Sequence, residues 1–288
     1  MNAKTKTKTK RTLRLLAVLL WFPFCAQAQE APELLPTHFT RSGSTYGFGI
    51  ITSCFDSYLS PNNYMGLELN LMNERWRRFS EKYDNLFQQS ISETSVGITE
   101  AGSTSSMMVT NETLTDAIVW RLARLGVVDV YAGPEMQFRF GADYNTRNSN
   151  NPVNVQLGLH LAGTAMAEVR YRIGRLPARS SYQIDMPVVG AVFAPQYTQS
   201  YYEIFSLKHY GGIVHFASPF NAFSMRRILT TELTHRDTIF RLVFENDAYQ
   251  WRTSTNSYAF RTFRIGFGYV FNSYSILPRE KAYRHIPY

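Results

Sequence analysis

VNVQLGLHLAGTAMAEVRYRI, residues Val153–Ile173, is the stretch that decides the fold, because its residues alternate without a break. The odd positions hold Val, Leu, Ala, Tyr and Ile with one Gly, whereas Asn, Gln, His, Glu and Arg occur only at even positions. A period of two predicts a β-strand rather than a helix. At about 3.3 Å per residue the strand spans roughly 70 Å, more than a strand of a water-soluble sheet needs. A strand that crosses a bilayer needs only about 9–11 residues, and it can continue beyond the membrane.

The first 28 residues have the features of an export signal. Six basic residues precede a short apolar segment, Leu15–Phe24, and Ala26-Gln27-Ala28 fits a signal-peptidase site, so cleavage is predicted after Ala28. The apolar segment is too short to span a membrane as a helix. Cys25 raises the alternative of a lipoprotein, but Phe22 and Phe24 stand where small residues are usual.

The composition of the mature chain narrows the classes of partner. Removing the six basic residues of the signal lowers the formal net charge from +8 to +2, so no nucleic-acid partner is predicted. Cys54 is the single cysteine left, which excludes an intramolecular disulfide. Aromatic residues make up 15% of the chain, and no apolar run reaches 18 residues, so no helical membrane span is predicted.

Other segments repeat the alternation and predict further strands. These are Ser44–Phe55, Tyr64–Phe79, Leu86–Thr99, Val128–Asp143, Tyr182–Ala194, Ala222–Leu233, Thr238–Trp251 and Tyr258–Phe271, with one or two more in Ser200–Ala217. Glu100–Thr113 is rich in Ser and Thr and predicts a long loop. Asp116–Leu125 has a mixed period, which leaves a short helix open, and Gly174–Arg179 predicts a basic turn.

The pattern favours a membrane barrel over a soluble β-sandwich or a lipocalin-like barrel. The strands are long and their turns are mostly short, and aromatic residues such as Trp76, Trp251 and Tyr269 lie towards strand ends, as in interfacial girdles. The last strand, Phe263–Phe271, has an aromatic residue or Ile at every second position and ends in Phe. We therefore expect an all-β fold, a transmembrane antiparallel up-and-down β-barrel over residues 44–272. A leader (29–43) precedes it and a tail (273–288), expected to be periplasmic, follows it.

The strand number depends on residues 153–173. Counting them as one strand gives eleven segments, but bacterial single-chain barrels usually have an even number. Splitting the run gives twelve strands, and an odd-length hairpin loop at Ala162-Gly163-Thr164 would preserve the phase of alternation. We predict about twelve strands, with ten as the alternative.

Charged and polar residues on the non-apolar faces predict a polar network in the lumen. Arginines and carboxylates occur in balanced numbers, so they can pair across a narrow barrel and close it. The predicted lumen residues are Glu68, Asp129, Glu135, Arg139, His160, Glu168, Arg170, Arg226, Glu232, Arg241, Glu245 and Arg264.

Catalytic, metal and cofactor sites are not predicted. His160 and Glu168 share a face, but about 26 Å of extended strand separates them, and no His-x-Ser-Asn pattern of a lipid hydrolase occurs. The six histidines show no zinc-ligand spacing. Glycines such as Gly266 and Gly268 lie within a strand and form no phosphate loop.

Three motifs carry a family resemblance. Tyr58-Leu59-Ser60-Pro61, Asn145–Pro152 (NTRNSNNP) and Ser200–Phe205 (SYYEIF) are similar to motifs of a Bacteroidota outer-membrane β-barrel family known as a domain of unknown function. The resemblance covers about Thr45 to Phe271. It implies location and fold, and it transfers no activity.

The sequence therefore predicts a Gram-negative outer-membrane barrel that is structural or narrow-lumened rather than a general porin. A small-solute channel and an outer-membrane lipid hydrolase remain the alternatives. The expected partners are outer-membrane lipid and the barrel-insertion machinery, and the sequence specifies no protein partner.

Overall fold

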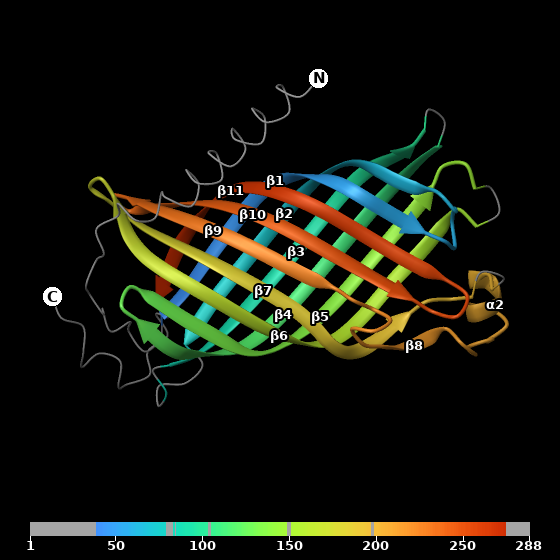
Figure 1. Ribbon diagram of the computed structural model, residues 1–288. Helices are drawn as coiled ribbons and strands as arrows, with labels where there is room; N and C mark the ends of the chain where they lie inside the picture. The colour runs from blue at the N-terminus through green and yellow to red at the C-terminus, as the bar shows by residue number, and fades with distance from the viewer. Residues whose placement is uncertain are drawn as a thin grey trace, which may run out of the picture.

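The computed structural model describes residues 39–78, 83, 85–102, 105–148, 151–196 and 199–274, and shows a closed antiparallel barrel (Figure 1). Ten strands form the wall: β1 (Phe39–Asp56), β2 (Asn63–Arg78), β3 (Leu86–Ala101), β4 (Ser105–Leu125), β5 (Val128–Asn145), β6 (Val153–Ile173), β7 (Leu176–Phe193), β9 (Met225–His235), β10 (Thr238–Arg252) and β11 (Ser257–Tyr274). Each pairs with its neighbours along the chain, and β1 pairs with β11, which closes the sheet. The predicted all-β barrel is confirmed.

One connection carries structure of its own, between β7 and β9. It contains a short helix, α2 (Tyr201–Phe205), and a four-residue strand, β8 (Val214–Ala217), in the segment where one or two strands were predicted. Among the described strands, β8 pairs with β7 alone, at Gly190–Phe193, beyond the part of β7 that pairs with β9. The wall thus has ten strands, with β8 outside the closed order.

Residues 153–173 form a single strand, so the hairpin predicted at 162–164 is wrong. With β8 outside the wall, the ten strands agree with the ten-stranded alternative. Both ends of β6 pair with β5, Val169 opposite Val128 and Val153 opposite Tyr144. Gly163 lies in mid-strand between Pro134 and Met186. The phase of alternation never changes because the strand continues.

The predicted loop at Glu100–Thr113 and the helix alternative at Asp116–Leu125 are also wrong, because β4 is a strand of 21 residues. Its inward positions include Met107 and Val109, which are fully buried, whereas Glu112 and Asp116 lie on the outward face. Glu112 accepts hydrogen bonds from Ser92 and Thr94, and Asp116 from Ser90 and Gln88 of β3. In β4, polar residues face outward and apolar residues face inward at these positions, which is the opposite of the arrangement in β6. The alternation therefore did not predict this strand.

The two ends of the barrel differ in their connections. Phe39 pairs with Tyr274, so β1 begins and β11 ends at one end of the barrel, which we call the terminal end. Two-residue turns there join β4 to β5, β6 to β7 and β9 to β10; the predicted turn 174–179 is only Gly174-Arg175. The opposite end, which we call the loop end, carries the α2–β8 connection. β1 starts five residues inside the predicted leader, and residues 1–38 and 275–288 lie outside the described residues.

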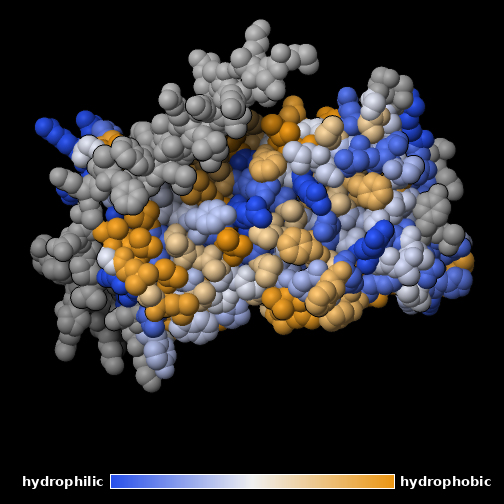
Figure 2. Space-filling view, in the orientation of Figure 1, coloured by the Kyte–Doolittle hydropathy of each residue, from blue (hydrophilic) through white to orange (hydrophobic). Residues whose placement is uncertain are grey.

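The outward face carries many exposed apolar side chains. On β2, Leu67 and Leu69 are 66% and 72% exposed, and Phe48, Phe263 and Phe267 are more than half exposed on β1 and β11. Figure 2 shows orange hydrophobic patches along the wall, mixed with blue groups that are denser towards the loop end. In the described part of the chain, no helix is long and apolar enough to cross a membrane.

Candidate functional site

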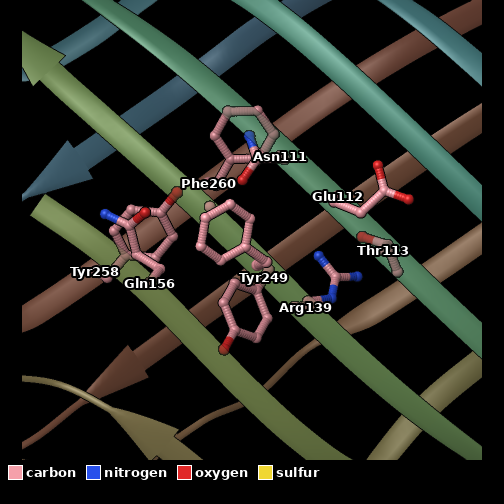
Figure 3. A pocket seen from close by; sticks show the side chains of 10 residues that line it. Asn111, Glu112, Thr113, Arg139, Gln156, Tyr249, Tyr258 and Phe260 are labelled. Atoms are coloured by element: carbon pink, nitrogen blue, oxygen red, sulfur yellow. The ribbon is translucent and has the colours of Figure 1, made fainter.

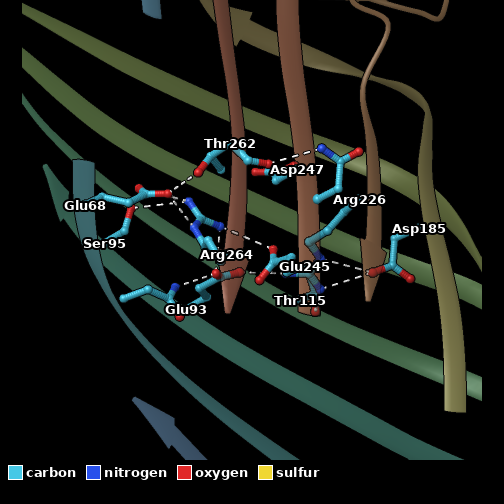
Figure 4. Close-up of polar contacts among 12 residues, drawn as sticks. Glu68, Glu93, Ser95, Thr115, Asp185, Arg226, Glu245, Asp247, Thr262 and Arg264 are labelled. Carbon is cyan, nitrogen blue, oxygen red and sulfur yellow. Dashed lines mark hydrogen bonds and ion pairs between the residues drawn. The ribbon is translucent and has the colours of Figure 1, made fainter. Parts of the chain in front are cut away.

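The centre of the lumen contains a cluster around Arg264 of β11, which alternation directs inward. Its guanidinium donates to Glu68 at 2.8 Å, to Glu93 at 2.7 Å and to Glu245 at 3.2 Å (Figure 4). These acids come from β2, β3 and β10, and all are buried. One arginine therefore joins four strands through charge-assisted hydrogen bonds.

Arg226 of β9 extends this cluster. Its guanidinium is 3.1 Å from a carboxylate oxygen of Asp185 on β7 and 3.4 Å from Glu93, and it donates to Thr115 of β4 (Figure 4). The Arg226 side chain is only 1% exposed. Because Glu93 contacts both Arg226 and Arg264, the two arginines belong to one network that crosses the barrel.

Arg139 of β5 forms a separate pair with Asp247 of β10. Two parallel hydrogen bonds of 2.8 Å join them, and the guanidinium lies 4.6 Å from the centre of the Tyr249 ring. Bidentate pairing fixes both side chains, and the ring adds a cation–π contact.

A third group of ion pairs lies towards the terminal end. Arg241 contacts Glu232 at 2.8 Å and Glu74 at 2.6 Å, and Arg41 also pairs with Glu232. Three further pairs lie beyond them: Arg179 and Arg170 contact Glu168 at 2.8 and 2.9 Å, and Arg124 contacts Asp129 at 2.7 Å. The side chains of Arg124 and Arg170 are 41% exposed, so this group reaches solvent.

Towards the loop end the interior changes from ion pairs to aromatic rings and amides. Tyr249, Trp251 and Tyr258 pack together, and Gln156 donates to both Asp56 and Asp143 at 3.2 Å. A small cavity of about 10 Å³ lies beside Tyr249 and Gln156 (Figure 3). That volume holds about one water molecule.

Helix α2 contacts this layer from the α2–β8 connection. Ser200 and Glu203 form a capping box at its start, and Ile204 is fully buried. Tyr201 donates to Asn154 at 2.8 Å and accepts from the backbone N–H of Val155. Burial raises the pKa of Tyr201, so its phenol keeps the proton that it donates.

His160 is buried, and its Nε2 atom has no hydrogen-bond partner among the described residues. Its ring meets the ring of Tyr249 edge-on at 5.9 Å. Gly158 and Gly190 leave the room for it: an added Cβ would lie 2.7 Å from Nε2 at Gly158 and 2.5 Å from Nδ1 at Gly190. His160 and Glu168 are not brought together, because Glu168 pairs with arginines near the terminal end.

The structure groups most of the predicted lumen residues, and separates two. Glu68, Glu245, Arg264 and Arg226 share the central network; Arg241 and Glu232 form one pair, and Arg170, Glu168 and Asp129 another group. Arg139 pairs with a residue that was not predicted. Glu135 is buried, and neither of its carboxylate oxygens has a hydrogen-bond partner within the described ranges; like His160, it lies outside these ion pairs.

Several charged residues of the lumen were not predicted from the sequence: Arg41, Glu93, Arg124, Arg179, Asp185 and Asp247. Asp247 shares the parity of Arg241 and Glu245, so the same alternation identifies it. Glu93 lies in the weakly patterned β3, where polar residues occupy both faces. Among the described residues, no three His, Cys, Asp or Glu side chains are placed to hold a metal ion.

Solved structures similar to this fold are outer-membrane proteins. The translocator domain of autotransporter NalP from Neisseria meningitidis has 9% identity and a TM-score of 0.37, covering 93% of this chain and 98% of that one. The outer membrane protease OmpT from Escherichia coli has 5% identity and a TM-score of 0.41, covering 85% and 99%. The COG4313 outer membrane channel from Pseudomonas putida F1 has 9% identity and a TM-score of 0.36, covering 84% and 100%. Likenesses this weak carry no functional argument.

No curated protein matches the sequence. The family model described as "Protein of unknown function (DUF3316)" matches residues 13–280. The predicted resemblance to a family of unknown function is therefore confirmed, whereas its Bacteroidota origin stays a prediction. Because the match spans most of the sequence, the chain belongs to the DUF3316 family.

Proposed function

We propose that this protein is an outer-membrane β-barrel with a closed lumen, which acts as a structural element of the membrane rather than as a general porin. The observation that carries the proposal is the central network, where Glu93 links Arg226 and Arg264 across the interior. Ten strands enclose a narrow lumen, and large paired side chains fill it.

The location rests on the outward face and on the predicted export signal. Exposed Leu67, Leu69, Phe48, Phe263 and Phe267 are suited to lipid contact. Outer-membrane barrels have short periplasmic turns and longer extracellular loops. We therefore place the terminal end in the periplasm and the loop end, with α2, outside. Outer-membrane lipid and the barrel-insertion machinery are the proposed partners.

Membrane integration is tested by carbonate extraction and by gel mobility. We expect the protein to stay in the membrane pellet and to migrate faster unboiled than boiled, as folded barrels do. Release by carbonate, or a mobility unaffected by boiling, would contradict the proposed location.

Lumen closure is tested by sugar-driven swelling of liposomes that contain the refolded protein. We expect swelling no faster than in protein-free liposomes, because the central network blocks the path. Rapid swelling would favour the small-solute channel.

The lipid-hydrolase alternative is tested in a deletion strain. Changed acyl profiles of lipid A or phospholipids, restored by the wild-type gene, would favour the lipid hydrolase.

A further inference from the structure

A groove on the outer wall lies between the late start of β9 and a bulge in β1. Its volume is about 390 Å³, and Phe223 and Phe263 are among the side chains that line it. β9 begins opposite Ala248, so the next residues of β10 pair with β11 on one side and with no strand on the β9 side. There Asn221 accepts a hydrogen bond from the Arg252 N–H instead. Beyond β11, a bulge displaces β1 between Ile51 and Ser53.

Two arginines flank this groove. Arg227 of β9 lies opposite Asn246, and Arg261 of β11 lies opposite Ala248, both of which line the groove from β10. Both arginines are exposed on the outward face. Arg261 itself lines the groove.

Neither arginine has an acidic partner within the described ranges. Arg261 donates to Gln250 at 3.0 Å, and the Nε of Arg227 lies 3.0 Å from the sulfur of Met225. The acids of β9 and β10, Glu232, Glu245 and Asp247, are all buried inside the barrel. The wall around the groove is therefore positively charged as well as apolar.

These features fit one kind of ligand. A guanidinium binds a phosphate through two parallel hydrogen bonds, whereas exposed phenylalanines suit an acyl chain. Arg227 contacts Met225 and Arg261 contacts Gln250, and each contacted residue lies nearer the loop end than its arginine. Both guanidinium groups therefore point towards the loop end. The groove volume falls in the range of small-molecule sites.

We propose that the groove binds a phosphate-bearing lipid of the outer leaflet, with Arg227 and Arg261 at its phosphate and its acyl chain along Phe223 and Phe263. This inference rests on the membrane location proposed above. It does not depend on whether the lumen is closed.

The test measures lipid retention by native mass spectrometry of the refolded protein in detergent. The probes are lipid A, phosphatidylglycerol and diacylglycerol, which has no phosphate, each added separately. The variant is Arg227→Gln with Arg261→Gln, and the matched control is Arg75→Gln with Arg77→Gln, two exposed arginines of β2. Heat-modifiable mobility verifies that each variant is folded.

We expect the wild type and the control to retain a phosphate-bearing lipid, and the groove variant to lose at least about tenfold in apparent affinity. Equal retention of the phosphate-bearing lipid by the groove variant, or equal retention of diacylglycerol by the wild type, would overturn the proposal. Binding of inorganic phosphate alone by the wild type, with neither phosphate-bearing lipid retained, would assign the arginines to free anions and also overturn it. Because the assay uses folded protein in detergent, its failure is distinct from failure of carbonate extraction, which tests the location.

Discussion

Arg139 on β5 and Asp247 on β10 are joined by two parallel hydrogen bonds of 2.8 Å, although 108 residues separate them in the chain. Neither strand neighbours the other in the sheet, so the contact passes through the lumen. Both side chains are buried. The pair therefore links two separated parts of the wall and helps to fill the space between them.

Asp247→Leu should be strongly destabilising, because it leaves the buried Arg139 guanidinium without its carboxylate. We expect a loss of about 3–5 kcal/mol in the free energy of unfolding. Arg139→Met combined with Asp247→Leu should cost less than either single change, because it removes both charges. Reversible urea unfolding of the refolded barrel, followed by tryptophan fluorescence, measures each value. Additive costs in the double variant would contradict this account of the pair.

Glu93→Gln should cost less than Asp247→Leu, although Glu93 contacts two arginines. Arg264 keeps Glu68 and Glu245, and Arg226 keeps Asp185. We expect a loss of about 1–3 kcal/mol by the same unfolding measurement. Glu100→Gln, at an exposed position of the same strand, is the control and should change stability little. Equal effects at the two positions would show that the central network does not stabilise the barrel.

Substitution by alanine should destabilise the barrel at one glycine of β6 and have little effect at another. An alanine Cβ at Gly158 would lie 2.6 Å from the Tyr249 hydroxyl and 2.7 Å from Nε2 of His160. At Gly163 nothing lies within 4 Å. We expect Gly158→Ala to destabilise by about 1–3 kcal/mol and Gly163→Ala to be nearly neutral. A neutral Gly158→Ala would mean that His160 and Tyr249 are not packed over that glycine.

The continuity of β6 is open to a cross-linking experiment in a Cys54→Ser background. Val169 pairs with Val128 of β5. A hairpin centred on Gly163 would instead bring Val169 opposite Leu157. We therefore expect Val169→Cys to form a disulfide with Val128→Cys and not with Leu157→Cys, because paired strand residues lie within disulfide range. Cross-linking to position 157 would restore the twelve-stranded fold.

The sequence was informative where apolar residues face outward. Val153–Ile173 and Val128–Asp143 show the alternation clearly, and both are strands. The sequence did not predict β4, because polar Glu112 and Asp116 face outward there and apolar Met107 and Val109 face inward. Missing β4 lowered the predicted count by one, whereas two strands counted in Ser200–Ala217, which holds no strand of the wall, and an assumed hairpin raised it to twelve.

For the lumen, alternation predicts which side chains share a face but not which of them meet. Arg264 contacts acids of three other strands, and those contacts depend on the register of the closed sheet. His160 and Glu135 show the limit of this reasoning, because each shares the polar face and neither joins an ion pair in the described part of the chain. Groove residues such as Phe223 lie at strand interruptions, which periodicity does not reveal.

Ion conductance in planar lipid bilayers tests the central claim, a barrel closed by paired side chains, most directly. The refolded protein, verified by its heat-modifiable mobility, is inserted into the bilayer, and a known porin serves as the positive control. We predict no steady single-channel currents, because Glu93 joins Arg226 and Arg264 across the lumen. Steady currents from the wild-type protein would contradict the closed barrel.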